Sequence, residues 1–270
     1  MIESKCKLCG SSEGEEILNV SECSDTYLDY MNLSYEDQNR FYKKCSNCGF
    51  TYRNMYLTQS EKDELYRIFR DEGLRNETHE QYFERISNLP MEESENGEKY
   101  LFLKDFINDS GKHMDIGGGL GVFSFGFKKF FPSWDSVVVE PTEGANEIAE
   151  KNGITSHNIY LDENSSGIVG DNFDLITANH VVEHVDDPIS FLVLLKQYIS
   201  STGMICIEMP STLDIGFLDK THDRFMSQHE VIYDNKSVNE ISERAGLKVL
   251  FNGNYISKRG RNNVRAILQK

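Results

Sequence analysis

Residues 112–121 read Lys-His-Met-Asp-Ile-Gly-Gly-Gly-Leu-Gly and decide the fold of this chain. They describe a short apolar strand that ends near an acid and runs into a glycine-rich turn. Glycine has no Cβ, so such a turn can adopt positive φ and leave room for a ligand against the backbone. The stretch therefore predicts a nucleoside-binding turn between a strand and a helix, made of Gly117, Gly118, Gly119 and Gly121.

A second apolar strand, residues 136–139, ends at Glu140 and is stopped by Pro141. An acid about twenty residues after the first glycine is where a nucleotide-binding βαβ unit places the carboxylate that binds the two ribose hydroxyls. Dinucleotide enzymes prefer G-x-G-x-x-G, but the third glycine position falls here on Val122 or Ser124. The sequence therefore matches the pyrophosphate-binding motif only if its third glycine is replaced by valine or serine.

Residues 115–121 resemble the first motif of class I S-adenosylmethionine-dependent methyltransferases, which is an acid and an aliphatic residue followed by G-x-G-x-G. Residues 173–188 are similar to the fourth strand of that family and the turn after it. Residues 203–210 and 229–247 resemble its later segments. The resemblance covers residues 98–270 and implies an α/β fold with a Rossmann-like seven-stranded, mostly parallel sheet.

The resemblance also implies S-adenosylmethionine as the cofactor. Its motifs assign cofactor binding to an acid, the glycine turn, the tip of the second strand and the end of the fourth, namely Asp115, Gly117, Gly118, Gly119, Gly121, Glu140, Pro141 and Asn179.

A methyltransferase that acts on a hydroxyl needs a general base, and histidine suits that task at neutral pH. His180 follows the fourth strand and is the first candidate, with His184 and His229 as second candidates. Glu183 is expected to be structural. Possible acceptor contacts lie in the insert after the fifth strand and in the helical segment before the first, namely His222, Arg224, Gln228 and Tyr82.

Two C-x-x-C-G knuckles, Cys6 with Cys9 and Cys45 with Cys48, have the spacing that lets paired thiolates surround one tetrahedral ion. In a reducing compartment four such cysteines favour a metal site over two disulfides. We therefore expect a structural zinc ion in a small zinc-ribbon-like domain, residues 1–58. Residues 59–97 read as a helical linker that could close as a lid, and residues 98–270 as the methyltransferase domain.

Composition favours a cytoplasmic enzyme that acts on small molecules. The 44 acidic and 28 basic residues give a net charge of −16, which opposes binding to nucleic acid. No apolar run reaches the length of a membrane span, and the first residues lack the layout of a signal peptide. The sequence leaves the oligomeric state open.

A zinc module joined to a methyltransferase domain resembles the enzymes that methylate deoxysugars and surface polysaccharides. The C-methyltransferases among them have a further C-terminal domain and a Y-H-E-H segment, where residues 227–230 here read Ser-Gln-His-Glu. This departure favours O-methylation of a sugar or nucleotide-sugar over C-methylation of a keto-deoxysugar.

Other classes of function stay open at this point. Residues 180–184 also spell H-x-x-E-H, a zinc motif of metallopeptidases that needs both histidines on one helix. A nucleoside-binding module without catalysis, or an NAD-dependent sugar-modifying enzyme, would share the glycine turn.

Overall fold

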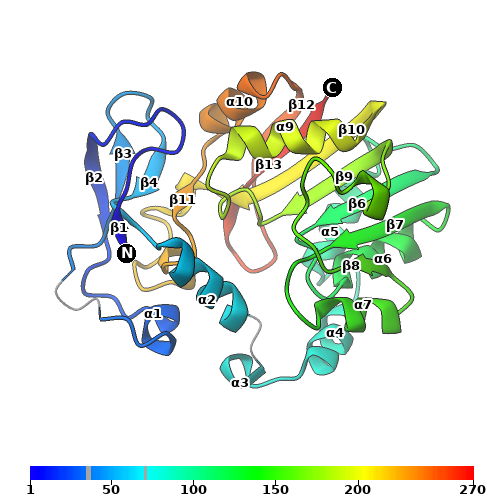
Figure 1. Ribbon diagram of the computed structural model, residues 1–270, viewed down its shortest axis with the longest axis horizontal. Coiled ribbons are helices and arrows are strands. Elements are labelled where there is room, and N and C mark those ends of the chain that lie inside the picture. Colours follow the sequence, from blue (N-terminus) through cyan, green and yellow to red (C-terminus); the bar gives the residue numbers. More distant parts are fainter. Residues whose placement is uncertain (35–37, 70–71) are drawn as a thin grey trace.

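The computed structural model describes residues 1–34, 38–69 and 72–270, and its largest sheet has seven strands in the order β12-β13-β10-β9-β6-β7-β8 (Figure 1). Strand β13 runs antiparallel to both of its neighbours, and all other neighbouring pairs are parallel. This confirms the predicted seven-stranded, mostly parallel sheet. The strands are β6 (Gly111–Ile116), β7 (Trp134–Val139), β8 (Thr155–His157), β9 (Phe173–Asn179), β10 (Ile199–Pro210), β12 (Lys248–Ile256) and β13 (Asn262–Gln269).

Helices cover both faces of this sheet, which is why its central strands are apolar on both sides. The side chains of Val137 and Val139 pack toward one face, and that of Val138 packs with Ala149 on the other. The first face is covered by α8 (Ser166–Val169), α9 (Pro188–Tyr198) and α10 (Asn235–Arg244), and the second by α5 (Glu95–Leu103), α6 (Val122–Phe130) and α7 (Ala145–Lys151).

The N-terminal part forms a smaller four-stranded sheet in the order β11-β4-β3-β2. Its edge strand β11 comes from far along the chain, where Val231 pairs with Tyr52. Both sheets contribute to one continuous apolar core, so the N-terminal module is packed onto the large domain. The elements are β1 (Ile2–Glu3), β2 (Gly14–Asn19), α1 (Thr26–Tyr30), β3 (Phe41–Cys45), β4 (Thr51–Arg53), β5 (Met55–Tyr56) and β11 (Val231–Ile232).

Three helices connect the two sheets along one side of the molecule (Figure 1). Of these, α4 begins at a capping box in which Thr78 and Gln81 bond each other's backbone, and its Phe83 packs on Leu120 and Val122 beside the glycine turn. The helices are α2 (Gln59–Phe69), α3 (Glu72–Arg75) and α4 (His79–Ser87). The insert after β10 holds the short turns η1 (Thr212–Asp214) and η2 (Asp223–Phe225). Within the described residues, no helix has the length and apolar character to cross a membrane.

Candidate functional site

The glycine turn lies between β6 and α6, where the chain order in the sheet reverses between β6 and β9. Gly117, Gly119 and Gly121 have φ of 65°, 58° and 78°, a region that L side chains rarely adopt. A Cβ on Gly117 would lie 2.6 Å from the Val181 side chain in the loop after β9. The turn therefore needs glycine both for its backbone and for its close approach to that loop.

Glu140 ends β7 and lies directly against this turn. Its Oε2 accepts a hydrogen bond from the Gly119 amide at 2.8 Å, and its Oε1 accepts one from the Thr142 amide at 3.0 Å. The side chain is 5 % exposed. The glycine turn and the acid expected to bind a ribose therefore share one buried corner. Pro141, next in the chain, is half-buried.

Asp115 lies beneath the turn rather than beside its open side. Its carboxylate accepts hydrogen bonds from Thr177 at 2.6 Å and Ser124 at 3.3 Å. Thr177 also contacts the His113 ring, which reaches Ser136 through its other nitrogen. Burial raises the pKa of Asp115 to about 6, against these hydrogen bonds, and lowers that of His113 to about 3. The structure thus places Asp115 where it supports the turn.

Asn179 and His180 follow β9 on the other side of the reversal point. The Asn179 Nδ2 atom is buried and has no hydrogen-bond partner among the described residues. His180 has a φ of 56°, and its amide donates to the Glu208 carbonyl at 2.7 Å. The left-handed residue turns the chain sharply out of the strand, which brings the His180 ring back over the sheet edge.

Both ring nitrogens of His180 face carboxylates. Nδ1 lies 3.1 Å from Glu183 Oε1, and Nε2 lies 3.3 Å from Glu208 Oε1. Burial opposes a charge on the ring, but the hydrogen bonds to Glu183 and Glu208 outweigh it and raise the pKa of His180. With a carboxylate at each ring nitrogen, neither nitrogen is left to take a proton from an acceptor, so this geometry disfavours His180 as a general base. Residues 180–187 form turns, not the helix that the peptidase motif needs.

Glu208 is the centre of a buried charged group at the same edge. Its carboxylate pairs with Lys99 of α5 at 3.1 Å and with Arg265 of β13 at 2.8 Å. Although burial opposes ionisation, Lys99, the His180 hydrogen bond and Arg265 hold the pKa of Glu208 well below its usual range. We did not expect this group from the sequence. The sequence did contain a signal for such a group, because each of two apolar strands includes one charged residue, at positions 208 and 265.

His184 and His229 form a second, different arrangement. Their rings stack at 5.4 Å, His184 coming from the loop after β9 and His229 from the segment before β11. The Nδ1 atoms contact the carbonyls of Gln228 at 2.8 Å and of Arg224 at 2.9 Å, respectively. Burial lowers the pKa of both histidines, that of His229 strongly. Two neutral rings with exposed Nε2 lone pairs are the result.

Three of the four expected acceptor contacts, His222, Arg224 and Gln228, lie together in the insert beside the histidine pair, and Tyr82 lies in another cluster. Arg224 is 2 % exposed and pairs with Asp214 at 3.0 Å, which ties its guanidinium to the insert instead of leaving it for a phosphate. The His222 ring accepts the Arg224 amide and caps η2. Gln228 is buried, and its side-chain amide donates to the Asp223 carbonyl. Tyr82 of α4 packs in the cluster beside the glycine turn, away from the histidine pair.

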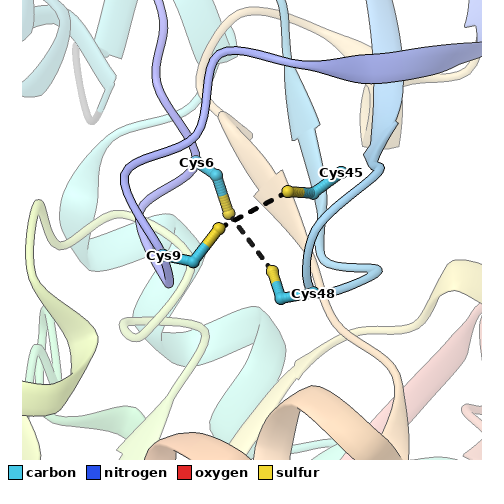
Figure 2. Close-up of side chains that lie close together, drawn as sticks. All are labelled: Cys6, Cys9, Cys45 and Cys48. Carbon is cyan, nitrogen blue, oxygen red and sulfur yellow. Dashed lines mark hydrogen bonds between the residues drawn. The ribbon is translucent and has the colours of Figure 1, made fainter.

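The four cysteines of the knuckles converge in the N-terminal module (Figure 2). The sulfurs of Cys6 and Cys48 lie 3.6 Å apart, those of Cys9 and Cys45 lie 3.5 Å apart, and all four lie within 4.8 Å of one another. Sulfurs bound about 2.3 Å from a tetrahedral zinc ion are about 3.8 Å apart. The donor set and its spacing therefore fit zinc.

The cysteine module is fixed to the histidine pair through Glu230. This carboxylate is 4 % exposed and pairs with Lys7 of the first knuckle at 2.9 Å and with Lys62 of α2 at 3.1 Å. The hydroxyl of Tyr42, in β3, donates to the carbonyl of His229 at 2.5 Å. The position of His229 therefore depends on the N-terminal module.

Residues 79–251 match the model of a protein family described as a methyltransferase domain. The chain belongs to this family. It is also 24% identical over 133 residues to an uncharacterized methyltransferase of Schizosaccharomyces pombe. That match covers 45% of this chain and 48% of the relative, so the chain spans about half the length of the curated relative that it matches.

Solved methyltransferase structures share the fold. The plantazolicin methyltransferase BpumL, solved with S-adenosylhomocysteine, has a TM-score of 0.55 and is 17% identical, over 78% of this chain and 98% of that one. The magnesium protoporphyrin IX methyltransferase of Synechocystis, also solved with S-adenosylhomocysteine, has a TM-score of 0.53 and is 12% identical, over 77% and 100%. At such identities the likeness concerns the fold alone.

Proposed function

We propose that this protein transfers the methyl group of S-adenosylmethionine to a hydroxyl of a small polar acceptor, a sugar or nucleotide-sugar precursor of a surface polysaccharide. The contact between Glu140 and the Gly119 amide carries the proposal, because it sets a ribose-binding carboxylate against the glycine turn. Solved relatives of the same fold hold S-adenosylhomocysteine. Gly117 to Gly121, Glu140, Pro141 and Asn179 would bind the cofactor, with Asp115 supporting the turn from below.

The sulfonium methyl of the cofactor is already electrophilic when bound, so the protein must mainly orient an acceptor oxygen and help it to lose its proton. His184 and His229 present neutral rings with free Nε2 lone pairs. His180 is held between two carboxylates and supports them. We assign activation of the hydroxyl to the first two histidines and positioning to the third.

The choice of acceptor rests on the N-terminal module and on charge. A net charge of −16 opposes polyanions such as RNA and DNA, whose binding depends on Lys and Arg. The cysteine module would hold a structural zinc ion in the cytoplasm, where thiols stay reduced. Its ion pairs to Glu230 fix the segment that presents His229.

Transfer of a labelled methyl group from S-adenosylmethionine to a panel of nucleotide-sugars tests the proposal. We expect an alkali-stable methyl ether in one sugar class and S-adenosylhomocysteine in equal amount. Labelling at a sugar carbon would move the assignment to C-methylation. Binding of S-adenosylmethionine without turnover on sugars, phenols or peptides would support a non-catalytic nucleoside-binding module.

A further inference from the structure

Glu183, His184 and His229 meet where the loop after β9 faces the segment before β11. Each offers one ligand atom, and the three atoms lie within 4.8 Å of one another. Glu183 is fully buried, and the two histidines are half-buried, so the cluster is closed on the carboxylate side and accessible beside the rings. It lies apart from the four cysteines, which form a separate cluster.

The hydrogen bonds around the cluster involve one nitrogen of each histidine ring and leave the other nitrogen free among the described residues, as is usual for histidines that bind a metal. His184 and His229 each use Nδ1 toward a backbone carbonyl, which leaves the Nε2 lone pair, and neither Nε2 has a hydrogen bond within the described part of the chain. Metal-binding histidines are held in this way by their second nitrogen. The two carbonyls therefore favour the tautomer in which Nε2 of each ring carries the lone pair.

Glu183 has one oxygen in use and one without a partner. Oε1 lies 3.1 Å from His180 Nδ1, whereas Oε2 is buried and has no hydrogen bond among the residues that the structure describes. An unpaired buried carboxylate oxygen is costly and calls for a cation or a donor. His180 thus serves as the outer partner of Glu183, as the carbonyls do for the two histidines.

We propose that Glu183, His184 and His229 bind a divalent first-row transition-metal ion, with zinc as the representative ion, at a second site distinct from the cysteine cluster. Two imidazole nitrogens and one carboxylate oxygen form the donor set of catalytic zinc and iron sites that keep open positions. Side-chain rotation would bring the three atoms to the bond lengths of about 2.0–2.2 Å that zinc requires.

The role of this ion rests on the proposed function, and with the ion bound His184 and His229 would activate the hydroxyl as metal ligands instead of as proton acceptors. An acceptor hydroxyl on the open position would lose its proton to solvent water, because a bound cation lowers the pKa of oxygen ligands. The alkoxide oxygen then forms a bond to the methyl carbon, and the carbon–sulfur pair returns to sulfur. An ether and S-adenosylhomocysteine are the products, with no oxidant or reductant needed.

Metal content of the full-length protein tests the site directly. After purification with zinc, we expect two zinc ions per chain by elemental analysis, of which dialysis against EDTA removes one. Cobalt(II) added to the dialysed protein should show weak d–d bands without the strong sulfur-to-cobalt absorption of a thiolate site. One zinc ion per chain, with no further cobalt bound, would overturn the proposal.

Variants identify the ligands. His184→Ala and His229→Gln should each lower the affinity for cobalt more than 100-fold by calorimetry, and retain the tightly bound zinc ion and the thermal unfolding midpoint of the metal-free wild type. His157→Ala, in β8, is the matched control and should bind cobalt as the wild type does. Added zinc should raise the unfolding midpoints of the EDTA-dialysed wild type and of the His157→Ala control, and should leave those of the two ligand variants unchanged. Unchanged cobalt affinity in both ligand variants would refute the assignment.

The failure of this inference is distinguishable from the failure of the proposed function. If no metal binds while the dialysed enzyme still transfers methyl groups at full rate, the metal site is refuted and methyl transfer stands. If cobalt binds at the histidines but neither S-adenosylmethionine nor S-adenosylhomocysteine binds at the glycine turn, the proposed methyl transfer is refuted and the metal site stands.

Discussion

The proposed cofactor half and the proposed acceptor half of the site are built differently. The cofactor half consists of the glycine turn and Glu140, which belong to one βαβ unit and bond each other directly. The acceptor half combines the loop after β9, the segment before β11 and the N-terminal module, held together by Glu230. The first depends on local backbone conformation, and the second on contacts between segments that are far apart in sequence.

This difference predicts which changes should disrupt each half. The cofactor half should survive the loss of the N-terminal module, because its residues lie within the large sheet. The acceptor half should not survive this loss, because the cysteine knuckles, Lys7 and Tyr42 together hold the segment around His229 in place. Variants that separate the two halves therefore test the comparison.

The largest effect is expected from Cys45→Ser. Loss of one thiolate would remove the proposed structural zinc ion, and the binding free energy of such an ion in small zinc domains is about 10–16 kcal/mol. We expect loss of the EDTA-resistant zinc, disorder of the N-terminal sheet by hydrogen exchange and loss of methyl transfer. S-adenosylhomocysteine should still bind within about threefold of wild type by calorimetry. Cys23→Ala, in the same module, should retain zinc. Loss of cofactor binding together with zinc would break the comparison.

Glu208→Gln should have the next largest effect. Removing one member of a buried charged group costs about 3–5 kcal/mol, because Lys99 and Arg265 remain buried without their counter-charge. Urea unfolding should show this loss in the free energy of unfolding. The exposed pair of Glu80 and Lys151 offers a control, and Glu80→Gln should leave the unfolding curve unchanged. Equal curves for both variants would show that the Glu208 group is not tightly paired.

Glu140→Ala addresses the cofactor half alone. Hydrogen bonds to a charged group contribute about 1.5–3 kcal/mol, so the affinity for S-adenosylhomocysteine should fall about 10- to 150-fold. Cobalt binding at the histidine pair should be unchanged. Glu143→Ala, exposed and three residues further on, is the control and should bind the nucleoside normally. A weaker cobalt site in Glu140→Ala would mean that the two halves are coupled.

The smallest effect concerns the pH dependence beneath the glycine turn. Burial lowers the pKa of His113 to about 3, so below pH 6.5 the unfolded chain binds a proton that the folded chain does not. The contribution of the neutral His113 ring to the free energy of unfolding is fully present above pH 6.5. It decreases as the pH falls, by about 2 kcal/mol from pH 7 to pH 5. His113→Gln should remove this loss in urea unfolding at the two pH values.

Asp115→Asn serves as a control of opposite sign. Burial raises the pKa of Asp115 to about 6, so the folded chain holds its proton more tightly than the unfolded one. The contribution of Asp115 to the free energy of unfolding therefore decreases as the pH rises from about 4 to 6. Because Asp115→Asn lacks the stabilisation that the wild type gains from this group at lower pH, the variant should lose more stability on acidification than the wild type. The same pH response in both variants would contradict the buried positions of these groups.

The cofactor half could be predicted from sequence because its signals are local. Four glycines and an acid-tipped strand lie within short stretches whose geometry follows from residue type. The two cysteine knuckles of the N-terminal module are local signals of the same kind. The resemblance implied a seven-stranded, mostly parallel sheet, which is confirmed.

The acceptor half could be predicted only in part. The sequence named His184 and His229 as candidates, but their surroundings depend on pairings between distant segments. Strand β11 has two residues and no signal that it joins the N-terminal sheet. His180 looked free because Glu208 comes from another strand, and Arg224 looked available because Asp214 lies ten residues before it. A single arginine in a polar insert does not show in sequence whether it faces solvent or a buried acid.

The most direct test of this account is a calorimetric titration of two proteins, the wild type and a His184→Ala/His229→Ala double variant, with S-adenosylhomocysteine and with NAD. We predict that S-adenosylhomocysteine binds both proteins with the same affinity and that NAD binds neither. Binding of NAD to the wild type, or loss of S-adenosylhomocysteine affinity in a folded double variant, would contradict a self-contained cofactor half.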